Sequence, residues 1–143
     1  MKTLVIYATK TGASFQCANI LAQELPHCTL CDIEVEKVDF TDYDCLILGA
    51  GVRDGKIYKP IRDILKKNKE ILLQKKTGYF ICNEKQKKTE EIIADNFTDD
   101  LQKSAVCIQS FGGYKAYAAP KEGMDQLKGL NVEAIKVFAQ KFK

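Results

Sequence analysis

Hydroxyl side chains gather in the segment that follows the first apolar run of the chain. The segment consists of Thr9, Lys10, Thr11, Gly12, Ala13 and Ser14. A helix that begins there would offer unpaired backbone N–H groups and the positive end of its dipole to a phosphate. The three hydroxyls would add donors, and Gly12 would let the backbone approach closely. The sequence predicts anion binding here, with an ordinary hydroxyl-capped turn as the alternative.

Two further segments of small or polar residues follow later apolar runs. One comprises Gly49, Ala50, Gly51, Val52, Arg53, Asp54 and Gly55, and the other comprises Cys82, Asn83 and Glu84. None of the three segments contains a Walker loop or a GxGxxG fingerprint. No Ser-His-Asp or Cys-His arrangement is evident, and the sole histidine, His27, lies far from these segments in the sequence. We therefore expect ligand binding and name no acid–base catalyst.

Apolar runs alternate with amphipathic stretches along the 143 residues, which suit one domain with one core. Strands are expected at 3–8, 30–38, 44–49, 77–82 and 105–111. Helices are expected before Pro26, from Pro60 to Leu72, from a Thr89 cap to Leu101 and after an Asn131 cap, with a helical turn at 124–128. This order predicts a doubly wound parallel sheet of five strands between helices, whose carboxyl edge carries all three segments.

In that context the first segment resembles the FMN phosphate loop of flavodoxins, Thr/Ser-x-Thr-Gly-x-Thr/Ser after the first strand. The second resembles the Gly-Ala-Ser-Ile-Arg-Tyr-Gly loop of flavodoxin-like proteins akin to menaquinone-dependent protoporphyrinogen dehydrogenase. Gly112 and Gly113 are similar to a small-residue loop of the same subgroup. The resemblance implies one flavodoxin-like domain over residues 1–143, with the strands in the order 2-1-3-4-5.

The resemblance also implies FMN as the cofactor and gives each segment a role. Residues 9–14 would hold the phosphate. Residues 51–55 would border one side of the isoalloxazine ring, and Cys82, Asn83 and Glu84 would border the other side. A glycine near the flavin N5 would let a peptide reorient and accept a hydrogen bond from the reduced ring. FMN would supply the redox chemistry while the protein tunes it.

Three functions remain open at this point. The leading hypothesis is an FMN-binding electron-transfer protein. The second is an FMN-dependent protoporphyrinogen IX dehydrogenase that passes electrons to a quinone, although the segment 113–129 is short and Asp54 replaces the tyrosine of the subgroup pattern. The third is a flavin-free binding or regulatory module, because no stacking aromatic is evident. Tyr58, Tyr114 and Tyr117 are the candidates for stacking, and a half-exposed loop position is the alternative for each.

Six cysteines in a chain expected to be cytoplasmic do not indicate a disulfide framework. Cys28 and Cys31 form a CxxC that follows a helix and enters a strand, so it lacks the helix N-terminus that activates a thioredoxin thiol. No second Cys/His pair completes a zinc site, and no metal is predicted. Cys45, Cys82 and Cys107 are expected to be small buried side chains, and only Cys82 ends its strand beside the expected cofactor.

The formal charge of +3 predicts no nucleic-acid partner. Residues 53–88, however, hold twelve Lys/Arg against four Asp/Glu. The hypothesis is a basic docking surface for a redox partner protein or a quinone, or for an anionic membrane, and the alternative is a solvated helix face. No apolar run approaches the roughly 20 residues that span a bilayer, and the N-terminus shows no secretory signal, so a cytoplasmic location is expected.

Overall fold

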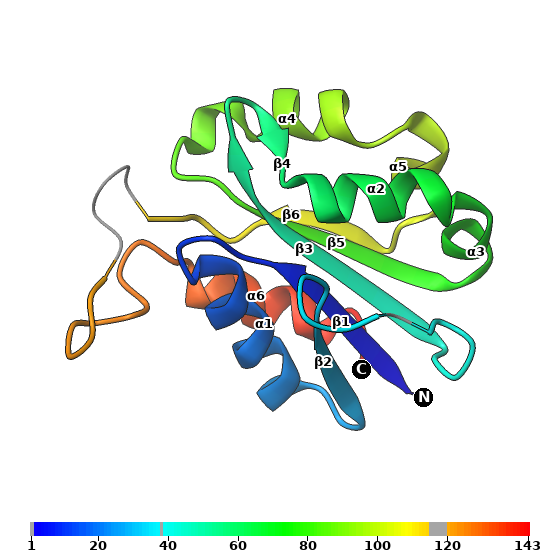
Figure 1. Cartoon of the computed structure of the whole chain (residues 1–143), viewed down its shortest axis with the longest axis horizontal. Coiled ribbons are helices and arrows are strands. Elements are labelled where there is room, and N and C mark those ends of the chain that lie inside the picture. The colour runs from blue at the N-terminus through cyan, green and yellow to red at the C-terminus, as the bar shows by residue number, and fades with distance from the viewer. Residues whose placement is uncertain (1, 38, 115–119) are drawn as a thin grey trace.

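The computed structural model describes residues 2–37, 39–114 and 120–143. A twisted sheet lies between two layers of helices (Figure 1). The elements are β1 (Thr3–Ala8), α1 (Ala13–Glu24), β2 (Cys28–Asp32), β3 (Cys45–Arg53), β4 (Lys56–Ile57), α2 (Lys59–Lys67), α3 (Lys69–Gln74), β5 (Lys76–Cys82), the 3-10 helix η1 (Gln86–Lys88), α4 (Thr89–Asn96), α5 (Asp99–Ser104), β6 (Cys107–Ser110) and α6 (Val132–Gln140). No helix within the described ranges is both long and apolar enough to cross a bilayer.

Five strands run parallel in the order β2-β1-β3-β5-β6, which confirms the predicted order 2-1-3-4-5. The central strand β3 is buried along most of its length, as its unbroken apolar run requires. Helices α1 and α6 cover one face of the sheet, and α2 to α5 cover the other (Figure 1). Two apolar clusters, one on each face, thus form the core.

The third strand is longer than the sequence analysis predicted. Residues 50–53 continue β3 instead of forming a loop, and the chain then turns back into β4, which pairs antiparallel with β3. Asp54 and Gly55 make the turn with φ of +53° and +77°. Positive φ at both central residues is what a two-residue hairpin requires, and Asp-Gly is a preferred pair for it. The sheet therefore has a sixth strand.

Two of the expected helices are each divided in two. The break between α2 and α3 falls at Asn68, and the break between α4 and α5 falls at Phe97, whose backbone is extended at φ −120° and ψ 128°. Thr89 is the first residue of α4 and not its cap, because Lys88 holds the cap position. The cap at Asn131 is confirmed, since its side chain accepts a hydrogen bond from Ala134 N–H at 3.0 Å.

Two strands and one turn also differ from expectation. Strand β2 ends at Asp32, whose carboxylate accepts the N–H of Glu34 at 3.0 Å, and this local turn competes with the continuation to residue 38. Strand β6 covers only Cys107–Ser110 of the expected 105–111. Residues 124–128 form hydrogen-bonded turns and no helix.

Candidate functional site

The three segments singled out in the sequence meet at one edge of the sheet. Ala8, the last residue of β1, pairs with Ala50 of β3, and Gly51 pairs with Cys82, the last residue of β5. Segments 9–14, 51–55 and 82–84 therefore leave the carboxyl ends of three adjacent parallel strands. Such an edge is where ligands bind in open α/β sheets.

The first segment forms a tight loop that leads into α1. Gly12 holds the cap position with φ +96°, and its N–H donates to Thr9 Oγ1 at 2.8 Å. A side chain at Gly12 would find open space, so the glycine is required by its backbone conformation and not by crowding. No side chain caps α1 and no acidic residue lies in its first turn. The first N–H groups of α1 are thus free to meet an anion.

Ser14 is the most informative residue of this loop. Its side chain is 1% exposed, and its hydroxyl has no hydrogen-bond partner in the part of the chain that the structure describes. An unpartnered buried hydroxyl destabilises a fold, by about 1–3 kcal/mol. A phosphate oxygen at the N-terminus of α1 is the kind of acceptor that would satisfy it. Lys10 and Thr11 are exposed, while Ala13 is buried.

The second segment forms the β3–β4 hairpin rather than a flexible loop. Tyr58, just after β4, donates its N–H to Gly51 C=O at 3.1 Å. Its ring lies on Gly51, where a Cβ would stand 2.7 Å from the Cζ atom. Gly55 C=O accepts a hydrogen bond from Asn96 Nδ2 at 2.8 Å. The carbonyls of both glycines therefore have hydrogen-bond partners within the protein.

The third segment is held by a network of polar side chains. Asn83 is 5% exposed; its Oδ1 accepts the hydroxyl of Ser110 at 2.7 Å and its Nδ2 donates to Lys85 C=O at 2.9 Å. Gln86 Nε2 donates to Asn83 C=O at 2.6 Å and to Ser110 Oγ at 3.2 Å. The Asn83 side chain is therefore engaged in joining the loop after β5 to β6. Glu84 is exposed.

Cys82 lies in a buried thiol pair under the site. Its thiol donates to Cys17 Sγ at 3.7 Å, and both side chains are buried. The hydrogen bond that the protonated Cys17 thiol shares with Cys82, together with burial, holds the pKa of Cys17 far above its usual value. Cys17 therefore stays protonated and is a poor nucleophile or metal ligand.

Two tyrosines flank this edge from opposite faces of the sheet. Tyr58 packs against the cluster under α2 to α5, and Tyr114 packs against the cluster under α1 and α6. Burial raises the pKa of both phenols. Tyr114 also donates its hydroxyl to Gln126 C=O at 2.7 Å. Tyr117, the third candidate for stacking, lies outside the described residues.

Sequence reasoning did not find Arg62 and Asn96, which hold the hairpin. Ile57 C=O accepts from Arg62 Nε at 2.9 Å, and Ile57 N–H donates to Asn96 Oδ1 at 3.1 Å. Asn96 is 39 residues away from Ile57 in the chain. No local pattern could have revealed the pairing, because it depends on the unpredicted strand β4.

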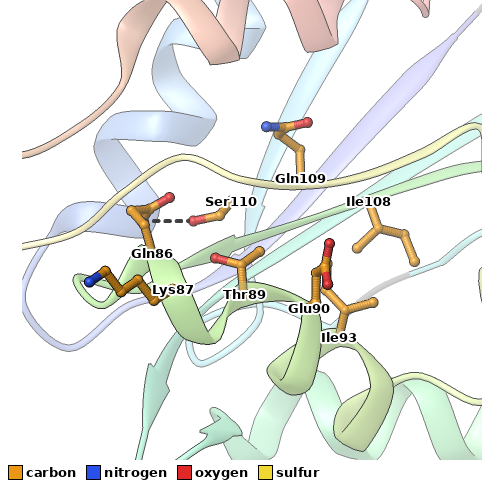
Figure 2. A pocket seen from close by; sticks show the side chains of 8 residues that line it. All are labelled: Gln86, Lys87, Thr89, Glu90, Ile93, Ile108, Gln109 and Ser110. Carbon is orange, nitrogen blue, oxygen red and sulfur yellow. Dashed lines mark hydrogen bonds between the residues drawn. The ribbon is translucent and has the colours of Figure 1, made fainter.

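A hollow of about 490 Å³ lies next to the third segment, whose Asn83 is bonded to two of the lining residues, Gln86 and Ser110. Figure 2 shows it between η1, α4 and β6, with the bond from Gln86 to Ser110 on its wall. A second hollow of the same size is lined by Glu84, Gln86 and the backbone around Gly112 and Leu130. Both are open and polar, and neither includes a residue of segments 9–14 or 51–55.

Exposed basic side chains border the carboxyl edge. We define the basic rim as Lys10, Arg53, Lys56, Lys85, Lys87 and Lys88, all of them exposed and all on the loops, the hairpin or η1 at this edge. Within the described ranges no rim residue belongs to an ion pair, and the interspersed acids are Asp54 and Glu84. The ammonium of Lys10 also lies 5.1 Å from the ring centroid of Tyr58.

Comparison with known proteins was made on sequence and on structure. A family model described as a flavodoxin domain matches residues 4–124. Protoporphyrinogen IX dehydrogenase (quinone) of Escherichia coli K12 is 26% identical over 96 residues, which are 64% of this chain and 53% of that protein. The same values hold for the protein of Escherichia coli O157:H7. The chain spans about half the length of the curated relatives it matches.

Solved flavodoxins share the fold over nearly the whole chain. A short-chain flavodoxin associated with a bacterial microcompartment is 21% identical, with a TM-score of 0.63 over 99% of this chain and 96% of that one. The Fusobacterium nucleatum flavodoxin bound to flavin mononucleotide is 13% identical, with a TM-score of 0.60 over 99% and 97% of the two chains. Likeness at these identities concerns the fold.

Proposed function

Because this chain belongs to the flavodoxin domain family, we propose that it binds FMN at the carboxyl edge of its sheet and carries electrons between redox partners. The observation that carries the proposal is the buried hydroxyl of Ser14, which lacks a protein partner in the described chain and stands at the uncapped start of α1. A site with free donors and no acidic side chain in its first turn fits a phosphate.

The remaining residues have separate roles in the proposal. The phosphate would be held by Ser14 and Thr11 together with the N–H groups that begin α1, while Thr9 keeps Gly12 in place. The hairpin at residues 51–55 and the loop at 82–84 would border the ring. FMN, when bound, supplies the electron-transfer chemistry, and the protein controls access and potential. We place this function in the cytoplasm.

The test is a titration of the apoprotein with FMN and, in parallel, with riboflavin, followed by flavin fluorescence and visible absorption. Riboflavin lacks the phosphate, so it reports on the ring-binding part alone. We expect FMN to bind at least tenfold more tightly than riboflavin. Equal affinities would remove the phosphate role of residues 9–14. Binding of neither flavin would favour the flavin-free module on the same fold.

We also propose that the basic rim docks an acidic redox partner. Charge of one sign around a site accelerates the approach of oppositely charged partners in a salt-dependent way. The test is reoxidation of the reduced holoprotein by ferricyanide, an anion, and by hexaammineruthenium(III), a cation. A variant with Lys85, Lys87 and Lys88 changed to Glu should be reoxidised more slowly by ferricyanide and faster by hexaammineruthenium(III) than the wild type. Reversal of Lys66, Lys67 and Lys103, which are exposed at the ends of α2 and α5 on the amino side of the sheet, is the control and should change neither rate comparably.

The curated relatives favour a second candidate, protoporphyrinogen IX dehydrogenation with a quinone as acceptor. Two features limit it: the match covers about half of those proteins, and Asp54 stands where the subgroup pattern has tyrosine. An assay with protoporphyrinogen and a soluble quinone, run against free FMN at the same concentration, decides. A rate no higher than that of free FMN eliminates this candidate and leaves the electron carrier.

A further inference from the structure

On the outer edge of the β3–β4 hairpin, backbone groups form hydrogen bonds with side chains. In a larger sheet a further strand would provide these bonds. Within the described residues β4 pairs only with β3. Its backbone groups at Ile57 are nevertheless satisfied, because Ile57 N–H donates to Asn96 Oδ1 and Ile57 C=O accepts from Arg62 Nε. Figure 1 shows β4 beside α4, the helix that ends at Asn96. The hairpin is thereby joined to the helical layer.

Both the oxygen and the nitrogen of the Asn96 side-chain amide form hydrogen bonds at this contact. Oδ1 accepts from Ile57 N–H at 3.1 Å, while Nδ2 donates to Gly55 C=O and to Ile92 C=O, both at 2.8 Å. The bond to Ile92, one turn earlier in α4, fixes the amide on its own helix. A rotated amide would place like groups against one another at all three contacts. Asn96 therefore holds one orientation toward the hairpin.

The hairpin tip, residues 54–55, has little else to keep it in place. Asp54 and Gly55 are exposed, and a Cβ at Gly55 would meet no atom within 4 Å. Asp54 adopts φ +53°, which the turn requires and which Asp tolerates without a contact from the rest of the fold. Among the described contacts, the bond from Asn96 to Gly55 is the one that ties the tip to a helix.

We propose that Asn96 is a positioning residue, which sets FMN affinity and reduction potential by holding the hairpin tip against α4. The inference rests on the proposed function, in which residues 51–55 border the flavin ring. Asn96 contacts the outer edge of the hairpin, and none of its described hydrogen bonds involves segments 9–14. Its removal should weaken the ring-binding part of the site and leave the phosphate-binding part unchanged.

Two variants separate the two bonds to the hairpin. Asn96→Ala loses both, whereas Asn96→Asp keeps an acceptor for Ile57 N–H and sets a carboxylate oxygen against the carbonyls of Gly55 and Ile92 in place of the donor. Gln102→Ala is the matched control: Gln102 Nε2 donates to Phe97 C=O at 2.7 Å, so the substitution removes a side-chain bond in the same helical layer without touching the hairpin. Hydrogen exchange of the Ile57 amide in the apoprotein, FMN and riboflavin affinities, and the midpoint potential are measured for each.

We expect the amide hydrogen of Ile57 to exchange about tenfold faster in Asn96→Ala than in wild type, which corresponds to about 1.4 kcal/mol. In Asn96→Asp it should exchange near the wild-type rate. Both variants should bind FMN and riboflavin more weakly by the same factor, about three- to tenfold, and shift the midpoint potential. Gln102→Ala should show none of these changes. If Asn96→Ala does not fold, Asn96→Asp still tests the bond to Gly55.

Unchanged flavin affinity and potential in both Asn96 variants overturn the proposal, whatever the exchange rate. Loss of FMN affinity alone, with riboflavin unaffected, also overturns it, because the effect would then lie at the phosphate. If the wild-type protein binds neither flavin, the proposed function itself is wrong. In that case the exchange of Ile57 still shows whether Asn96 holds the hairpin.

Discussion

The phosphate loop and the β3–β4 hairpin stand at the same edge of the sheet but obtain their hydrogen bonds from different distances. In the loop, Gly12 bonds to Thr9, three residues away, and the helix donors stay free. In the hairpin, Gly55 and Ile57 bond to Asn96, about 40 residues away. The loop is shaped locally and left open toward a ligand, whereas the hairpin is closed on its outer side by another layer of the fold.

This difference suggests a division of labour within the proposed FMN site. Free donors and an unpartnered hydroxyl give the phosphate end its affinity. At the ring end the carbonyls of Gly51 and Gly55 already have partners, so this end would contribute shape and a fixed environment for the flavin. Substitutions at the two ends should therefore change different quantities, and the following experiments test that claim from the largest expected effect to the smallest.

Ser14→Ala should have the largest effect and act on the phosphate end alone. Loss of a hydrogen bond to a charged group weakens binding by about 2 kcal/mol, or roughly 30-fold, for FMN and not for riboflavin. The same change should raise the stability of the apoprotein by about 1 kcal/mol, because it removes a buried hydroxyl that has no described partner. Flavin titrations measure the two affinities, and urea unfolding measures the stability of the apoprotein. An equal loss of riboflavin binding would contradict the division between the ends.

Gly12→Ala and Gly51→Ala should both lower stability, for different reasons. Gly12 has φ +96° and open space, so alanine there costs about 1 kcal/mol through backbone strain. Gly51 lacks space, since a Cβ would stand 2.7 Å from the Tyr58 ring, and the cost of displacing the ring is about 1–2 kcal/mol. Adding Tyr58→Ala should reduce the cost of Gly51→Ala and leave that of Gly12→Ala unchanged. Urea unfolding of the double variants supplies the comparison.

Alkaline pH should affect the ring end through Tyr58. Burial raises the pKa of this phenol, so the folded protein favours its neutral form. The resulting stabilisation is complete below the unfolded value of about 10 and is lost as pH rises above it. The drop in unfolding free energy between pH 8.5 and 10.5 should be smaller in Tyr58→Phe than in wild type. An identical drop would mean that Tyr58 ionises as freely in the folded chain as in the unfolded one.

The same contrast explains what the sequence could reveal. The loop at 9–14 was predictable because its glycine, hydroxyls and helix start are neighbours in the chain. The alternation of apolar runs with amphipathic stretches predicted the parallel sheet, and the resemblance to flavodoxins supplied its strand order; the structure confirms both. Strand β4 was not predictable from two residues, Lys56 and Ile57, and neither was its partner Asn96. The breaks at Asn68 and Phe97 carry no proline or glycine. Asn68 and Thr98, however, stand at the N-cap positions of α3 and α5 and are residue types that favour a helix start, a local signal that the expected long helices did not take into account.

Lys10 connects the phosphate loop to the hairpin, and substitutions there have the smallest expected effect. Its ammonium lies over the Tyr58 ring, so the phosphate loop contacts the residue that follows the hairpin. A double-mutant cycle with Lys10→Met and Tyr58→Leu should give a coupling of about 0.5 kcal/mol in apoprotein stability. Lys85→Met, at a rim lysine with no described aromatic contact, is the control and should show no coupling to Tyr58.

Flavin binding by Lys10→Met then shows which end the lysine serves. If it acts through Tyr58, FMN and riboflavin lose affinity equally, by about twofold, because the change reaches the ring. If it acts on the phosphate, only FMN binding weakens, and more strongly at low salt, since exposed charges are screened over about 10 Å at 0.1 M. We expect the first result from the contact seen in the structure. The second would make the phosphate end independent of the hairpin and sharpen the division between them.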